Sequence, residues 1–260
     1  MQLTVLGCWA PYPAPGGACS GYLIQNGETF IMLEAGNGSF GKLQKQLDFR
    51  RLAAVIITHL HPDHYLDLFC LRHAIAGAIR DGQRTGPLAL FVPNKPTADF
   101  ERLAQYTDAF IINPIEDLPL VQLTDDIRVR QARVGMMQLQ FATNYHLLPA
   151  YAVSVDGGQG KLVFSGDTAR TKDLAQLAAG ADLFLCEASG LDKDIEFVKS
   201  GHLTARQAGE LAREVGAKKL MITHFYPEYD LNTLGAQASA AFGKAVMLAK
   251  EEAKYDIRKT

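Results

Sequence analysis

The amino-acid sequence predicts an α/β fold, in which short buried strands alternate with helices. Two observations carry this prediction. Short apolar runs such as Leu52-Ala53-Ala54-Val55-Ile56-Ile57 have the length and the β-branched content of fully buried strands. Stretches with apolar residues at helical spacing lie between several of these runs.

The first half of the chain is expected to open with strands joined by tight turns, and Asn26-Gly27 is a strong hairpin signal. Residues 7–20 are rich in Pro and Gly, which predicts a loop, and its length suggests that it covers something. The strands expected in this half are residues 3–6, 21–24, 29–33, 52–57 and 88–92. The expected helices are residues 38–47, 62–79 and 98–110.

The second half repeats this organisation. Gly157-Gly158 is expected to turn one strand into the next, and Gly216 is expected to end a helix. The strands expected here are residues 138–143, 151–155, 161–164, 183–185, 219–222 and 245–248. The expected helices are residues 171–178, 204–215 and 231–242.

Four of the apolar strands end in residue types that bind metals or transfer protons. The endings are Thr58-His59, Ser165-Gly166-Asp167, Cys186-Glu187 and Thr223-His224. In layered α/β folds, ligands gather beyond the carboxyl ends of the strands, so these endings can converge on one cleft.

The segment Thr58-His59-Leu60-His61-Pro62-Asp63-His64 predicts a metal site, because three imidazoles and a carboxylate follow a rigid buried strand within a few positions. His146 is a loop residue between two strands and a further ligand candidate. Asp167 could instead be only a helix N-cap. His73 falls inside an expected helix and is interpreted as a packed or surface residue.

His59-Leu60-His61-Pro62-Asp63-His64, followed by His146, Ser165-Gly166-Asp167 and Thr223-His224, resembles the complete ligand series of the metallo-β-lactamase-fold hydrolases, in the same order. The resemblance implies a four-layer αββα sandwich that holds two divalent metal ions. It implies that His59, His61 and His146 bind one ion, that Asp63, His64 and His224 bind the other, and that Asp167 bridges them. Nitrogen and oxygen donors suit zinc, and manganese or iron can also occupy such sites.

Cys186-Glu187-Ala188-Ser189, followed by Gly201-His202-Leu203-Thr204-Ala205, is similar to the paired Glu and His motifs of ribonuclease Z and its phosphodiesterase relatives. This similarity implies that Glu187 and His202 act near the scissile phosphate, with Asp63 as a further catalytic residue that orients the attacking water. A carboxylate holds a neighbouring His in one tautomer and stabilises its protonated form, which suits it to bind a phosphoryl oxygen or protonate a leaving alkoxide. The alternative is that His202 or Thr204 only begins the following helix.

The expected function is therefore a dinuclear phosphodiesterase that acts on a small or cyclic nucleotide-like substrate through a metal-activated water. An alternative is hydrolysis of a lactone, thioester or β-lactam by the same centre. A non-catalytic metal-binding protein is a third possibility. Cleavage of precursor tRNA is disfavoured, because ribonuclease Z typically carries a long tRNA-binding arm where only twenty residues separate His146 from Asp167 here.

Length and composition complete these expectations. The 260 residues are 48% hydrophobic and 21% charged, and no linker divides them, which predicts one domain over residues 1–260. A net charge of −2 without a basic stripe argues against binding of long nucleic acid. Scattered cysteines, and the lack of a signal peptide or an apolar stretch long enough to span a membrane, predict a cytoplasmic protein. Apolar residues on more than one face of the expected helix 62–79 suggest a homodimer.

Overall fold

Two β-sheets form the centre of the structure, a computed structural model that describes residues 1–259. The first sheet has seven strands, of which the last four are mutually parallel. In spatial order they are β15 (Lys254–Asp256), β1 (Gln2–Gly7), β2 (Gly21–Asn26), β3 (Thr29–Ala35), β4 (Leu52–Ile56), β5 (Leu88–Val92) and β6 (Phe110–Pro114).

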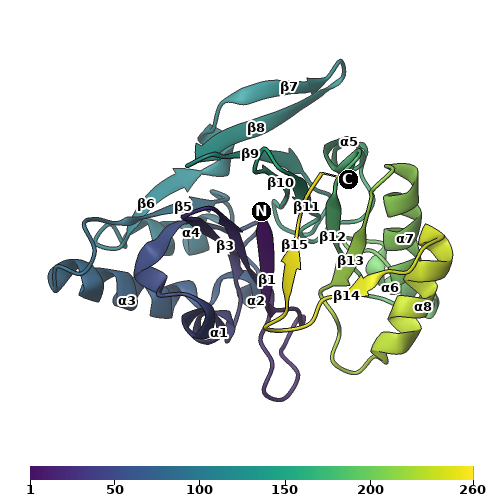
Figure 1. Cartoon of the computed structure of the whole chain (residues 1–260), viewed down its shortest axis with the longest axis horizontal. Coiled ribbons are helices and arrows are strands. Elements are labelled where there is room, and N and C mark those ends of the chain that lie inside the picture. The colour runs from purple at the N-terminus through teal and green to yellow at the C-terminus, as the bar shows by residue number, and fades with distance from the viewer. Residues whose placement is uncertain (260) are drawn as a thin grey trace.

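The second sheet has eight strands, of which the first four are mutually parallel. In spatial order they are β14 (Met247–Leu248), β13 (Leu220–Thr223), β12 (Leu183–Glu187), β11 (Lys161–Phe164), β10 (Tyr151–Asp156), β9 (Met137–Thr143), β8 (Ile127–Val134) and β7 (Leu120–Thr124). The hairpin of β7 and β8 projects from the body of the molecule (Figure 1).

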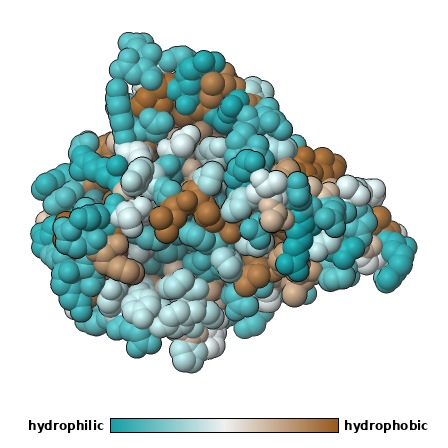
Figure 2. All heavy atoms as spheres, turned by 180° about the vertical axis from the view of Figure 1, so that it is seen from behind, coloured by the Kyte–Doolittle hydropathy of each residue, from teal (hydrophilic) through white to brown (hydrophobic). Residues whose placement is uncertain are grey.

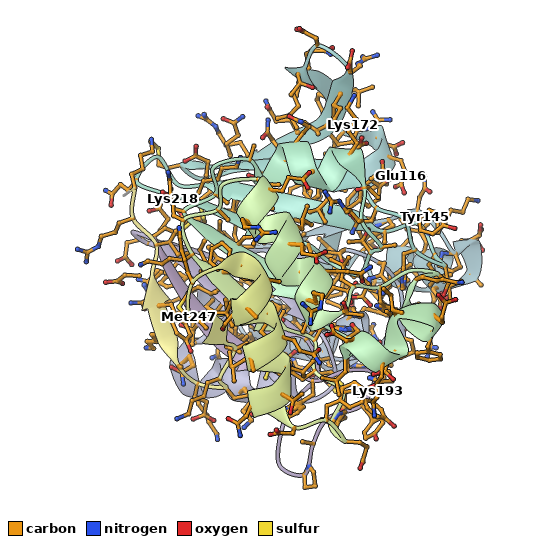
Figure 3. The ribbon with its side chains drawn as sticks, turned by 90° about the vertical axis from the view of Figure 1, so that its right-hand side faces the viewer. Glu116, Tyr145, Lys172, Lys193, Lys218 and Met247 are labelled. Atoms are coloured by element: carbon orange, nitrogen blue, oxygen red, sulfur yellow. The ribbon has the colours of Figure 1, made fainter. Side chains whose placement is uncertain are left out.

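Helices flank both sheets, and together the layers form the αββα sandwich that the sequence predicts (Figure 1). Beside the first sheet lie α1 (Ser39–Gln46), α2 (Pro62–Tyr65), α3 (Leu68–Arg80) and α4 (Thr97–Ala104). Beside the second lie α5 (Lys172–Ala178), α6 (Ile195–Val198), α7 (Ala205–Glu214) and α8 (Leu231–Phe242), with α7 and α8 side by side (Figure 3). Short 3-10 turns are η1 (Phe49–Arg51), η2 (Ile115–Asp117) and η3 (Asp192–Asp194).

The core is divided into two apolar clusters. The larger one fills the space between the sheets and continues under α5, α7 and α8, and the smaller one lies between the first sheet and its helices. Aromatic pairs join the sheets, with ring centroids 5.3 Å apart for Tyr22 and Phe164 and 6.2 Å apart for Phe91 and Phe141. The inner parallel strands are therefore mostly buried, as their near-continuous apolar sequences require, whereas the outer strands β6 and β14 are partly exposed.

Leu185 in β12 gives a test of this core, because its side chain is completely buried between the sheets and the helix layer. We expect Leu185→Ala to lower the free energy of unfolding by about 2–5 kcal/mol, since the mutation removes buried methyl groups and leaves a cavity. Urea denaturation followed by circular dichroism measures the change. Met136→Ala is the control, because Met136 is 76% exposed and its truncation should leave the midpoint unchanged.

Two of the expected helices were wrong in extent. The helix expected over 62–79 is interrupted between α2 and α3, where the Asp67 carboxylate accepts a hydrogen bond from the Phe40 backbone amide at 2.8 Å. The helix expected over 98–110 ends at Ala104, and Phe110 instead begins β6. The strands β6 to β8 and β15 were not predicted.

The expected β9–β10 strand pair is confirmed as antiparallel, and β11 follows β10 as its hairpin partner. Within residues 1–259, no helix combines the length and the apolar character needed to cross a bilayer. Hydrophilic residues cover most of the face seen in Figure 2, and hydrophobic residues gather there in separate patches.

Candidate metal centre

The polar residues predicted from the strand endings meet at one edge of the two sheets. His59 and His61 follow β4, and Asp63 and His64 lie in the short helix α2. From the second sheet come His146 after β9, Asp167 after β11 and His224 directly after β13. The structure therefore brings together all seven residues that the resemblance implies as metal ligands.

Two groups of donor atoms converge within this centre. In the first group, His61 Nδ1 lies 3.0 Å from His59 Nε2 and 3.0 Å from His146 Nε2. In the second group, His64 Nε2 lies 3.2 Å from His224 Nε2, and Asp63 Oδ2 lies 3.4 Å and 3.5 Å from these two nitrogens. Nitrogen or oxygen ligands about 2.1 Å from a tetrahedral zinc ion lie about 3.4 Å from one another, so both groups have the spacing of a metal site.

Asp167 lies between the two groups. Its Oδ2 atom is 3.5 Å from His59 Nε2, 3.4 Å from His64 Nε2 and 3.2 Å from His224 Nε2. Its Oδ1 atom is buried and has no hydrogen-bond partner among the residues that the structure describes. A buried carboxylate oxygen without a partner is unfavourable, and a bound cation would satisfy it.

The charges of the centre also fit a cation. Burial lowers the pKa values of His59, His61 and His146, so their neutral rings offer lone pairs. Although burial disfavours its charged form, His224 has a pKa raised to about 10 by Asp167 and Asp63. These two carboxylates thus favour a positive charge at this position, which a divalent ion would supply.

The outer ring nitrogens of His59 and His146 have hydrogen-bond partners, which leaves their inner nitrogens directed at the centre. His146 Nδ1 donates to the Gly201 carbonyl at 2.8 Å, and His59 Nδ1 lies 3.1 Å from Thr58 Oγ1. His64 Nδ1 faces Glu34 Oε2 at 3.5 Å. Such outer contacts fix the tautomer and the orientation of metal-binding imidazoles.

The backbone next to the ligands adopts conformations that few residues tolerate. His224 has a φ of 63°, in the left-handed region, which turns its ring away from the path of β13. Gly166, just before Asp167, has a φ of 56°, and a Cβ atom there would lie 2.6 Å from the Tyr151 carbonyl oxygen. A glycine is therefore required to bring Asp167 into the centre.

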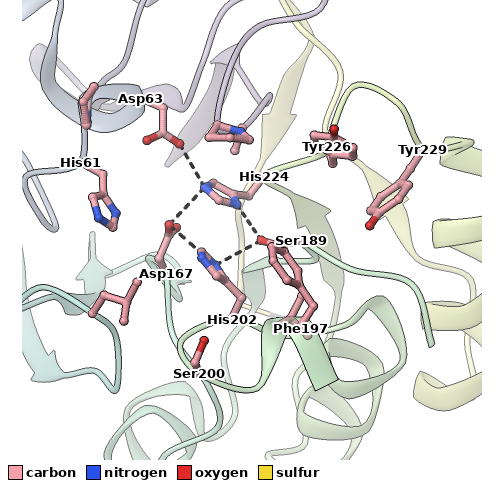
Figure 4. A pocket seen from close by; sticks show the side chains of 15 residues that line it. His61, Asp63, Asp167, Ser189, Phe197, Ser200, His202, His224, Tyr226 and Tyr229 are labelled. Carbon is pink, nitrogen blue, oxygen red and sulfur yellow. Dashed lines mark hydrogen bonds and ion pairs between the residues drawn. The ribbon is translucent and has the colours of Figure 1, made fainter. Parts of the chain in front are cut away.

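His202 lies beside the metal ligands Asp167 and His224 (Figure 4), and it forms a pair with Glu187 behind it. His202 Nδ1 lies 3.1 Å from Glu187 Oε2, and the other oxygen of Glu187 accepts a hydrogen bond from the Thr168 amide at 2.6 Å. Burial acts to lower the pKa of His202, but the Glu187 carboxylate raises that pKa above its ordinary value overall. Glu187 is completely buried and does not line the pocket, so it acts through His202.

Ser189 joins this pair to the metal ligands, a role that the sequence did not reveal. Its hydroxyl donates to Glu187 Oε2 and lies 2.7 Å from His224 Nδ1, whose N–H it can accept. With its Nδ1–H directed at Ser189, a neutral His224 ring would direct an unprotonated Nε2 at the centre. Glu34 was missed as well: it is the penultimate residue of β3, is completely buried, and its Oε1 accepts a hydrogen bond from the Thr58 amide at 3.0 Å.

We expect Ser189→Ala to weaken metal binding by about 10–100-fold, because His224 loses the contact that fixes its tautomer. Titration of the metal-free protein, followed by calorimetry, measures the change. Ser200→Ala serves as the control, since Ser200 lies on the pocket rim and no side-chain hydrogen bond from it is found in residues 1–259. Equal metal affinities in the wild type and Ser189→Ala would contradict the role of Ser189 in orienting His224.

A pocket of about 710 Å³ opens directly over this centre. His61, Asp63, Asp167, His202 and His224 form its floor. The walls come from six segments and comprise Ala10, Pro11, Pro62, Leu147, Ser189, Phe197, Val198, Ser200, Tyr226 and Tyr229.

The Pro/Gly-rich loop after β1 contributes Ala10 and Pro11 to the pocket, so it covers the site as its length suggested. The Ala18 amide of this loop donates to Glu251 Oε1 at 2.7 Å, and Glu251 Oε2 lies 2.8 Å from Lys42 Nζ. Trp9 does not line the pocket and instead packs edge-on against Phe225. His73, expected to be a packed or surface residue, is an exposed residue of α3.

Comparison with known proteins gives three informative matches. A family model described as the beta-lactamase superfamily domain matches residues 29–225. The chain is 27% identical to "Probable metallo-hydrolase YhfI" of Bacillus subtilis, over 96% of this chain and 97% of that protein. The crystal structure of YhfI matches with a TM-score of 0.87 at 25% identity, over 98% of both chains.

Two further matches are to proteins named as a ribonuclease and a diphosphatase. The chain is 24% identical to a ribonuclease Z of Clostridioides difficile, over 90% of this chain and 91% of that protein. The crystal structure of a diphosphatase from the PhnP family matches with a TM-score of 0.74, over 99% of this chain and 98% of that one. At 15% identity, this second likeness concerns the fold alone.

Proposed function

Because the chain belongs to the β-lactamase superfamily and is a metal-dependent hydrolase, we propose that it hydrolyses a small phosphodiester, such as a cyclic nucleotide, with two divalent metal ions. One observation carries the choice of a phosphodiester. His202, paired with the buried Glu187, lines the pocket beside the metal ligands, where a proton or hydrogen-bond donor can reach a phosphoryl oxygen. The name of the ribonuclease Z relative agrees with this choice.

In the proposed centre, His59, His61 and His146 would hold one ion, Asp63, His64 and His224 the other, and Asp167 would contact both. Zinc is the proposed metal, because five imidazoles and two carboxylates match its preferred donors. Two such ions supply a water of lowered pKa at neutral pH and neutralise the charge that develops on the phosphate.

The residues of the chain perform the remaining steps. Asp63 lines the pocket, and its carboxylate can accept a hydrogen bond from the attacking water and orient it toward the phosphorus. His202 presents Nε2 to the pocket, since Nδ1 is bound to Glu187. A protonated Nε2 can donate to a phosphoryl oxygen or transfer its proton to the leaving alkoxide.

Precursor tRNA is not the proposed substrate. The segment between His146 and Asp167 is occupied by the β10–β11 hairpin, which leaves no length for a separate arm there.

A substrate panel tests the proposal. Zinc-loaded protein is incubated with bis-p-nitrophenyl phosphate, a 3′,5′-cyclic nucleotide, precursor tRNA, a lactone, a thioester and a β-lactam. We expect turnover of the first two. Selective turnover of a carbonyl compound would assign the centre to acyl hydrolysis, and cleavage of the tRNA would assign it to RNA processing. Inactivity on every compound with both metals bound would indicate a non-catalytic metal protein.

A further inference from the structure

Two large apolar side chains are exposed at the mouth of the pocket. Phe197 in α6 is 84% exposed, and Leu147, in the loop after β9, is 75% exposed. Both line the pocket that contains His202 and the metal ligands. Large apolar residues gathered around a pocket commonly mark the place where an apolar part of a ligand binds.

Aromatic residues from the segment after β13 form another part of the wall. Tyr226 packs edge-on against Tyr229 and against Tyr12 of the Pro/Gly-rich loop, with ring centroids 5.0 Å and 5.7 Å away. The Tyr229 hydroxyl donates to Asp194 Oδ2 at 2.9 Å, directly before α6. This hydrogen bond ties the tyrosines to the segment that carries Phe197, so the walls are already assembled (Figure 4).

The charges around the pocket limit what these walls can bind. Among the described residues that line it, none is a lysine or an arginine. The Tyr12 and Tyr229 hydroxyls bond to carboxylates, Glu228 at 3.2 Å and Asp194 at 2.9 Å, while Lys193 Nζ lies outside the lining, 5.8 Å from the centroid of the Tyr229 ring. Away from the metal ligands and His202, the lining therefore offers no lysine or arginine to a second phosphate, but it offers aromatic faces and edges to a neutral ring.

We propose that Phe197 and Tyr226 form a subsite for a planar aromatic ester group, such as a nucleobase, on a diester whose only negative charge is the scissile phosphate. This inference rests on the proposed phosphodiesterase function and specifies the class of its substrate. A flat ring gains stacking and burial against these side chains, whereas a small alkyl group leaves them exposed to water.

Binding of two stable diesters of equal charge tests the subsite without requiring turnover. Diphenyl phosphate and dimethyl phosphate are titrated into zinc-loaded wild type and into Phe197→Ala, Phe197→Tyr and Tyr226→Ala. We expect the wild type to bind diphenyl phosphate at least about tenfold more tightly than dimethyl phosphate. Phe197→Ala and Tyr226→Ala should lose most of this ratio, whereas Phe197→Tyr, which keeps the ring, should retain it.

Ile195→Ala is the matched control, because Ile195 lies on the same short helix and is 45% exposed but does not line the pocket. A ratio near one in the wild type would overturn the inference, as would an unchanged ratio in both alanine variants. A different result would show that the subsite exists but that the proposed function is wrong. In that case diphenyl phosphate binds with the expected ratio, but bis-p-nitrophenyl phosphate is not hydrolysed.

Discussion

His202→Ala is expected to lower kcat for a phosphodiester by about 10²–10⁴-fold while the protein keeps its full metal content. The size of the effect follows from the position of the ring, which lines the pocket and is held at Nδ1 by Glu187. Metal content should not change, because three donors remain in the group of His59, His61 and His146 and in the group of Asp63, His64 and His224, although His202 also lies close to Asp167 and His224. Elemental analysis and initial rates on the same preparations measure both quantities.

Two substrates separate the possible actions of His202. If the ring protonates the leaving group, the loss of kcat should be much larger for an alkyl leaving group than for p-nitrophenolate, which departs without a proton. If the ring only binds a phosphoryl oxygen, the two losses should be equal. His73→Ala, a change at an exposed residue of α3, is the control. Full activity of His202→Ala on both substrates would contradict either role.

Asp167→Asn is expected to release both metal ions rather than one. The Oδ2 atom of Asp167 approaches donors of both groups, with His59 3.5 Å away on one side and His224 3.2 Å away on the other. An amide of the same shape keeps the packing but removes the negative charge that would be shared by two cations. Activity should fall by more than the roughly 100-fold that follows loss of an outer contact.

The metal stoichiometry of purified variants measures this outcome. His61→Ala should mainly reduce occupancy of one site, since His61 belongs only to the group with His59 and His146. Asp182→Asn provides a matched control, because Asp182 is also a buried aspartate but caps the opposite end of the sheet, where it accepts from the Lys161 amide. Wild-type stoichiometry in Asp167→Asn would exclude a shared ligand.

The sequence predicted the site well where an apolar strand ends in a histidine or an aspartate. His59, Asp167 and His224 each follow a completely apolar run, and the parallel strands bring these endings to one edge. Glu34 follows the same kind of run, Phe30-Ile31-Met32-Leu33, and could have been found by the same rule. Ser189 could not, because a serine is common after strands and only the fold places it between Glu187 and His224.

The errors in the fold prediction have tertiary causes. Leu103, Tyr106 and Phe110 have helical spacing, but Phe110 is buried because it pairs with Leu88 as part of β6. The β6 residue Ile111 is 55% exposed, so this edge strand lacks the continuous apolar pattern of a buried one. At the interruption before α3, the Asp67 carboxylate accepts a hydrogen bond from the amide of Phe40, which is distant in sequence. A local sequence pattern cannot predict such a contact.

The anchoring of the Pro/Gly-rich loop by Glu251 has a consequence for biosynthesis. The Ala18 amide and the Glu251 carboxylate that accepts from it are 233 residues apart, and β1 also pairs with β15, through Leu3 and Tyr255. At a translation rate of about 5–20 residues per second, the loop waits roughly 10–50 s for this partner. The first strand has an unpaired edge during this time. The anchored form of the pocket mouth can therefore be completed only after Glu251 and β15 have been synthesised.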